Sequence, residues 1–100
     1  MEFSKKKENG VVTVSLIGRL DTPAAQEIAP EMDLLKDDAN DIIVLDCTEM
    51  DYISSSGLRL FLTLRKAAAE KGGKVVIRGI SDSIRSVFMM TGFLNLFEIE

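Results

Sequence analysis

Three consecutive serines, Ser54, Ser55 and Ser56, are the residues in this chain whose types and spacing best suit chemistry. A serine hydroxyl can act as a nucleophile in hydrolysis, or it can accept a phosphoryl group from a kinase. Nucleophilic catalysis needs a general base beside the hydroxyl, and the chain contains no histidine to supply one. The composition therefore argues against a hydrolase and favours a serine that is modified or that binds a partner.

The serines lie where a buried strand is predicted to give way to a helix. Residues 42–45 form an apolar run rich in β-branched side chains, as in a strand covered on both faces. Beyond the serines, apolar residues recur at helical spacing from Leu58 to Ala69. The first turn of a helix has backbone N–H groups without intrahelical partners, and the helix dipole adds about half a positive charge there. The junction is therefore suited to an anion.

Two residues beside the serines bear on this interpretation. Arg59 places a cation near the helix start, where the dipole disfavours it, so it suits a phosphate or an acidic partner. Gly57 has no side chain, which would let a kinase or a docking surface approach Ser56 closely. A simpler alternative stays open, in which one serine is only the N-cap and Gly57 is an ordinary junction glycine. No Glu or Gln follows any of the serines by three positions, so no capping box is expected.

The composition sets limits on the class of protein. One hundred residues with 46% hydrophobic content predict a single domain over residues 1–100. A net charge of −4 argues against nucleic acid as the main partner. The single cysteine, Cys47, is predicted to be an inert core residue, and without histidine no metal site and no cofactor are predicted. No apolar run is long enough to span a membrane and the first residues lack a secretory signal, so a cytoplasmic protein is expected.

The rest of the pattern predicts short alternating elements. Residues 2–7 and 11–17 are predicted to pair as a hairpin around Asn9-Gly10. A helix follows, with Thr22 as its cap and Pro23 in its first position. The later elements are a strand over 42–47, a helix from the serines to about Lys71 stopped by Gly72-Gly73, a strand over 74–78, a helix capped by Ser81 or Asp82 and broken at Gly92, and a strand over 97–99. This order predicts an α/β domain with a mixed, mostly parallel sheet of four to five strands and three to four helices on one side.

Five segments in order, over nearly the whole chain, resemble the STAS family, the anti-sigma factor antagonists and their relatives. They are residues 16–21 (LIGRLD), 43–46 (IVLD), 53–58 (ISSSGL), 72–75 (GGKV) and 87–93 (VFMMTGF). In that family the serine or threonine immediately before the glycine is phosphorylated by a partner anti-sigma factor kinase and dephosphorylated by a PP2C-type phosphatase. The resemblance implies that this acceptor is Ser56, with Ser55 as the alternative.

The resemblance also implies a function and a partner surface. The unmodified protein would bind an anti-sigma factor and release a sigma factor, and phosphorylation of Ser56 would end the binding. The partner surface would consist of Asp21, Ser54, Ser55, Gly57, Leu58 and Arg59. Asp21 is alternatively an exposed turn residue beside the Thr22 cap. The protein is expected to be a monomer or a weak dimer.

A second function stays open on the same fold, namely a constitutive STAS scaffold or transport-complex subunit without a phosphorylation switch. The family often has Asp two positions before the acceptor, where this chain has Ser54, and this difference favours the scaffold.

Overall fold

The computed structural model describes residues 1–100 as one six-stranded sheet with three α-helices. The elements are β1 (Glu2–Glu8), β2 (Val11–Leu20), α1 (Thr22–Leu34), a 3₁₀ turn (Leu35–Asp38), β3 (Ile42–Asp46), β4 (Met50–Ile53), α2 (Ser55–Lys71), β5 (Lys74–Arg78), α3 (Asp82–Met90), a second 3₁₀ turn (Phe93–Asn95) and β6 (Glu98–Ile99). The strand order is β1-β2-β3-β5-β6, and β4 pairs with the far end of β2. Only β1 is antiparallel to its neighbour, so the prediction of a mixed, mostly parallel sheet is confirmed.

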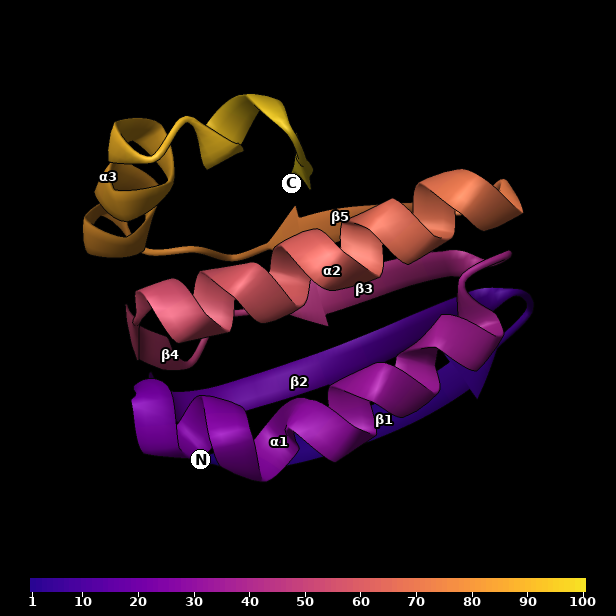
Figure 1. Cartoon of the computed structure of the whole chain (residues 1–100), viewed down its shortest axis with the longest axis horizontal. Helices are drawn as coiled ribbons and strands as arrows, with labels where there is room; N and C mark the ends of the chain where they lie inside the picture. The colour runs from indigo at the N-terminus through magenta and orange to yellow at the C-terminus, as the bar shows by residue number, and fades with distance from the viewer.

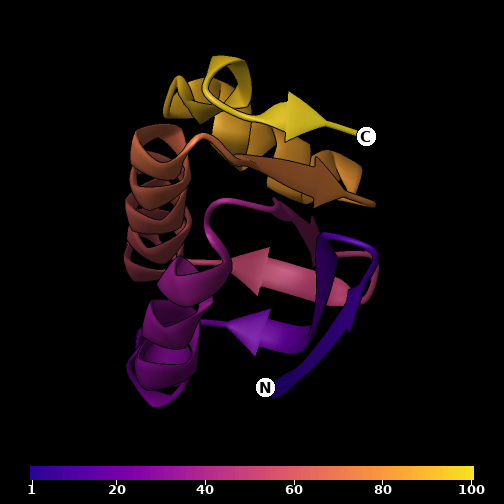
Figure 2. The ribbon, with the colours of Figure 1, turned by 90° about the vertical axis from the view of Figure 1, so that its right-hand side faces the viewer.

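Helices α1 and α2 lie side by side across one face of the sheet, and the core lies between them and the strands (Figure 1 and Figure 2). Alternate residues of the strands point into this core, as expected for strands that bury one face against helices. The helices contribute buried residues at helical spacing, for example Phe61 and Leu64. Both helices begin at the same end of the molecule, and α3 also lies at that end (Figure 1). None of the helices is long and apolar enough to cross a membrane.

Several local predictions are confirmed. Helix α2 ends at Lys71, and Gly72 caps it with a left-handed backbone, φ +82°. Ser81, rather than Asp82, caps α3 through a hydrogen bond that its Oγ accepts from the Ile84 N–H. Cys47 is fully buried, and burial raises the pKa of its thiol to about 12. A thiol with such a pKa stays protonated at neutral pH, which agrees with the predicted inert role.

The structure corrects three predictions. The sheet has six strands rather than four to five, because residues 50–53, between the predicted strand over 42–47 and the serines, form β4. The sequence pattern predicts a first helix that runs to residues 37–40, whereas α1 ends at Leu34 and residues 35–38 form a 3₁₀ turn. The cap of α1 is Asp21 rather than Thr22, because the Asp21 carboxylate accepts a hydrogen bond from the Ala24 N–H.

Two lysines of the edge strand hold the 3₁₀ turn in place. Lys5 Nζ and Lys7 Nζ lie 2.8 Å and 3.0 Å from the Asp38 carboxylate, and Lys7 also pairs with Asp41. The hydrogen bonds that Lys5 and Lys7 donate lower the pKa of Asp38, and the hydrogen bonds that Lys7 donates to Asp38 and Asp41 raise the pKa of Lys7. All three lysines of the run Lys5-Lys6-Lys7 pair with acidic side chains, because Lys6 Nζ also lies 3.5 Å from the Glu8 carboxylate.

Replacing Asp38 with asparagine is expected to lower the free energy of unfolding by less than about 1 kcal/mol at pH 7, since these pairs are partly exposed. A carboxyl group with a lowered folded-state pKa stabilises the protein above its unfolded pKa of about 3.9, and the contribution is lost as pH falls through the folded value. The difference in free energy of unfolding between the wild type and Asp38→Asn should therefore disappear in acid. Urea unfolding at pH 7 and at about pH 3 measures it, and a constant difference at both values would contradict this account.

Candidate functional site

The serine junction is positioned by two strands that end side by side. In the parallel pair of β2 and β4, Leu20 lies opposite Ile53. The residue after each of these is the N-cap of a helix, Asp21 for α1 and Ser54 for α2. The Ser54 N–H donates a hydrogen bond of 2.9 Å to the Leu20 carbonyl, which fixes the two helix starts next to each other. Two positive helix ends therefore meet at one edge of the molecule.

Each of the two caps uses its side chain for the fold. The Asp21 carboxylate accepts from the Ala24 N–H at 3.0 Å, and the Ser54 hydroxyl accepts from the Gly57 N–H at 3.2 Å. Asp21 also lies 3.6 Å from Arg19 Nε. Ser54 is therefore the capping serine that the simpler alternative expected, and Asp21 is a cap rather than a free turn carboxylate.

Replacing Ser54 with alanine is expected to lower the free energy of unfolding by about 1 kcal/mol, because the Gly57 N–H loses its acceptor. The matched control is Ser55→Ala, at an exposed position whose side chain makes no hydrogen bond in the structure, and it should change stability by less than about 0.5 kcal/mol. Chemical denaturation of both variants checks the prediction. Equal losses at the two positions would show that Ser54 is not the cap.

The other two serines are not used by the fold. Ser55 is exposed, and Ser56 is half-buried and lines a hollow of about 320 Å³ between α1 and α2. Arg59 lies in the same wall, one turn further along α2. The remaining lining residues are Thr22, Ala25, Gln26, Ala29, Leu60 and Thr63. The structure thus places the predicted acceptor Ser56 and the predicted cation Arg59 in one hollow.

Gly57 and Leu58 differ from the other predicted site residues because both are buried. A Cβ on Gly57 would lie 2.7 Å from Leu20 Cγ and 3.1 Å from Ile53 Cγ1. The missing side chain therefore faces the core, and the expectation that Gly57 opens the surface for a kinase is wrong. Leu58 is 3% exposed and packs in the core, so both residues position the serine turn rather than offer side chains to a partner.

Sequence reasoning missed part of this site. Thr22 and Gln26 line the hollow opposite Ser56. They are four residues apart and therefore lie on one face of α1, and this spacing was the only sign of their shared position in the sequence. Tyr52 was also missed: it lies in β4, and the Arg19 guanidinium stacks on its ring at 3.9 Å from the centroid. Such a pair is an ordinary cation–π contact, here between paired residues of β2 and β4.

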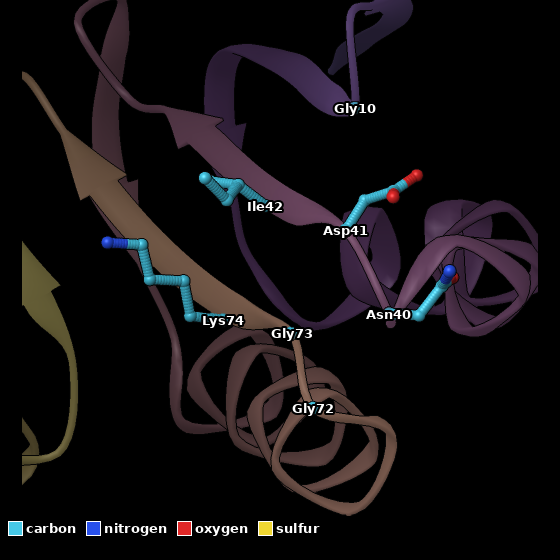
Figure 3. A pocket seen from close by; sticks show the side chains of 7 residues that line it. All are labelled: Gly10, Asn40, Asp41, Ile42, Gly72, Gly73 and Lys74. Carbon is cyan, nitrogen blue, oxygen red and sulfur yellow. The ribbon is translucent and has the colours of Figure 1, made fainter.

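A second hollow of about 310 Å³ lies at the opposite ends of the parallel strands (Figure 3). Its charged side chains are already paired, Asp41 with Lys7 and Lys74 with Glu98, and they point away from each other (Figure 3). The structure contains no group of three or more His, Cys, Asp or Glu side chains placed to hold a metal ion. The hollow beside Ser56 is therefore the stronger candidate site.

Comparison with known proteins identifies the family of this chain. The STAS domain model matches residues 2–100. A protein of Bordetella bronchiseptica that is named as an anti-sigma factor antagonist, BtrV, is 30% identical over 99% of this chain and 85% of its own length. The anti-sigma-B factor antagonist of Listeria monocytogenes is 23% identical over 96% of this chain and 84% of its own length.

Solved structures show the same fold. The crystal structure of a Thermotoga maritima protein named as an anti-sigma factor antagonist superposes with a TM-score of 0.87 at 19% identity, over 97% of this chain and 84% of its own. Anti-sigma factor antagonists are regulators rather than enzymes, which agrees with the prediction from the histidine-free composition. The family model and the relatives together show that this chain belongs to the STAS domain family, among homologues named as anti-sigma factor antagonists.

Proposed function

We propose that this protein is a cytoplasmic anti-sigma factor antagonist whose unmodified form binds an anti-sigma factor and thereby releases a sigma factor, and whose phosphorylation on Ser56 ends that binding. One observation carries the assignment to Ser56. Ser54 is occupied as the cap of α2, whereas the Ser56 hydroxyl is free of the fold and lines the hollow between the helix starts. Ser55, the alternative acceptor, is exposed but lies outside the hollow.

The names of the similar proteins support this proposal. The relatives from Listeria and Staphylococcus are named anti-sigma-B factor antagonists. The Bacillus protein SpoIIAA, which shares the fold with a TM-score of 0.75 over 99% of this chain and 91% of its own at 20% identity, has been solved in a phosphorylated form. A STAS fold of this kind can thus hold a phosphate.

The chemical step would be a phosphoryl transfer from ATP held by the partner. The Ser56 Oγ forms a bond to the γ-phosphorus, the bond from that phosphorus to the ADP oxygen breaks, and the hydroxyl proton leaves to a base on the kinase. No acidic side chain lines the hollow beside Ser56 and the chain has no histidine, so the base is assigned to the partner. Hydrolysis by a PP2C-type phosphatase would return the free hydroxyl and inorganic phosphate.

The other residues have supporting roles in this proposal. Asp21 and Ser54 cap the starts of α1 and α2, and Gly57 and Leu58 hold the serine turn against the core. Arg59 is exposed and is the residue of the set best placed to meet an acidic group. Ser54 stands where the family often has Asp, and because Ser and Asp cap helices about equally well, this difference no longer favours a constitutive scaffold.

The test is a phosphorylation reaction with the partner anti-sigma factor kinase and ATP. Wild-type protein should gain one phosphate, located on Ser56 by peptide mass spectrometry. Ser56→Ala should gain none, and Ser55→Ala, the matched control, should be labelled as the wild type. Equal labelling of wild type and Ser56→Ala would refute the assignment.

A further inference from the structure

The hollow beside Ser56 contains a cation that no acidic side chain neutralises. Arg59 forms no ion pair in the structure, although seven other lysines and arginines do, and no acidic residue lies in the first turn of α2. Arg59 follows Ser56 by three positions, so the two side chains share one face of the helix. Both line the same hollow.

The direction of helical side chains brings the Arg59 guanidinium towards Ser56. Side chains in an α-helix lean towards its N-terminus, so a long residue at position i+3 covers the turn that contains residue i. A guanidinium presents several N–H donors in one plane and binds phosphate through two of them at once. Across the hollow, Thr22 and Gln26 of α1 add a hydroxyl and an amide that can donate to the same anion.

We propose that a phosphate on Ser56 is bound within its own chain by Arg59, at the mouth of the hollow between α1 and α2. This inference rests on the proposed function, since it describes what Ser56 does once it is phosphorylated. In the unmodified protein Arg59 is available to an acidic group of the partner, and in the phosphorylated protein the phosphate occupies it. Phosphorylation thus adds negative charge and also withdraws a cation from the partner surface.

The intrachain pair has two measurable consequences. A neighbouring cation favours the dianionic form of the phosphate, whose second ionisation otherwise occurs near pH 6. The bound phosphate is also less available to a phosphatase that has no specificity for this protein. Both consequences belong to the chain itself and need no partner.

The experiment uses full-length protein with phosphoserine introduced at position 56 during translation, so that no kinase is involved. The ³¹P NMR titration midpoint should rise by about half a pH unit or more in Arg59→Gln, because the charge stabilising the dianion is lost. Lys66→Gln is the matched control, since Lys66 is exposed on the same helix about two turns further along. It removes the same charge and should shift the midpoint by less than about a fifth of a pH unit, as a screened distant charge does.

Dephosphorylation by alkaline phosphatase gives a second readout, which should be about threefold faster or more in Arg59→Gln than in Lys66→Gln. Arg59→Lys keeps the charge but not the paired donors, so its dephosphorylation rate should lie between those of Lys66→Gln and Arg59→Gln. Circular dichroism of each unmodified variant verifies that it folds. Equal midpoints and equal rates in Arg59→Gln and Lys66→Gln would overturn the proposal. That outcome would not contradict the labelling of Ser56 by the kinase. Conversely, a failure of kinase labelling would not affect this titration, so each proposal can be refuted without the other.

Discussion

Phosphorylation of Ser56 is expected to weaken the complex with an anti-sigma factor at least tenfold while leaving the fold intact. The phosphate adds a charge of about −1.5 to −2 at neutral pH. If a carboxylate of the partner approaches to ~4 Å, repulsion at an effective dielectric constant near 20 is on the order of 4 kcal/mol per unit charge pair before screening. Half of that already exceeds the 1.4 kcal/mol or so that corresponds to a tenfold change in affinity.

The fold should tolerate the phosphate because of where Ser56 lies. Its hydroxyl makes no hydrogen bond within the fold and opens into the hollow, and the first turn of α2 presents backbone N–H groups to an anion. The melting temperature of the phosphorylated protein should therefore stay close to that of the unmodified one. A large loss of stability would show instead that the modification acts by unfolding the serine turn.

Isothermal titration calorimetry of both forms against the same anti-sigma factor measures the effect. Ser56→Ala is the control for loss of the hydroxyl and should bind within about threefold of wild type, since a surface substitution of this kind changes free energies by about 0.5 kcal/mol at most. Raising the salt concentration should reduce the difference in affinity between the phosphorylated and unmodified forms, because exposed charges are screened. Equal affinities of both forms at low salt would refute the electrostatic switch.

The elements that could be predicted from the sequence are those fixed by local signals. Helix α2 and its stop were predicted closely because apolar residues recur at helical spacing and Gly72 supplies the left-handed cap. Strands β3 and β5 were predicted from short apolar runs between turn residues. In each case the residues that decide the structure lie within the element or next to it.

Strand β4 was missed because its signal is not local. Only Met50 and Ile53 of its four residues are buried, and Asp51 and Tyr52 between them are exposed. The strand exists because it pairs with residues 18–20 at the far end of β2, where the register shifts between Gly18 and Arg19. A sequence pattern does not show which strands pair. Asp21 and Ser54 lie close together because β2 and β4 pair, so their proximity could be expected only from the family resemblance.

Local signals in the sequence single out several residues of the candidate site but not their structural roles. Asp21 and Thr22 are both good caps, and the choice depends on which residue has the extended backbone, which is Asp21 at φ −85° and ψ −176°. Likewise the sequence shows that position 57 is glycine, but only the packing of Leu20 shows that its bare side faces inward. The hollow itself needs α1 and α2 packed together, so Thr22 and Gln26 could not be assigned to it beforehand.

Replacing Gly73 with alanine is expected to destabilise the protein by about 3 kcal/mol or more, the largest effect we expect from removing or adding one methyl group. A Cβ at position 73 would lie 2.1 Å from the Ala39 carbonyl oxygen and 2.3 Å from that of Asp41. Both atoms belong to the backbone, so the clash cannot be relieved by a side-chain rotation. The segment before β3 would have to move. The cost of this movement adds to the cost of overpacking, which is about 1–3 kcal/mol at a well-fitted site.

Gly72→Ala is the matched control, because it adds the same methyl group one residue earlier. That Cβ would meet nothing within 4 Å, and the only penalty is the left-handed backbone at φ +82°, about 1–2 kcal/mol. In urea unfolding, the free energy of unfolding of Gly73→Ala should be lower than that of Gly72→Ala by at least 1 kcal/mol, with similar m values. The reverse order would mean that backbone conformation at the end of α2, rather than its close approach to residues 39–41, dominates this junction.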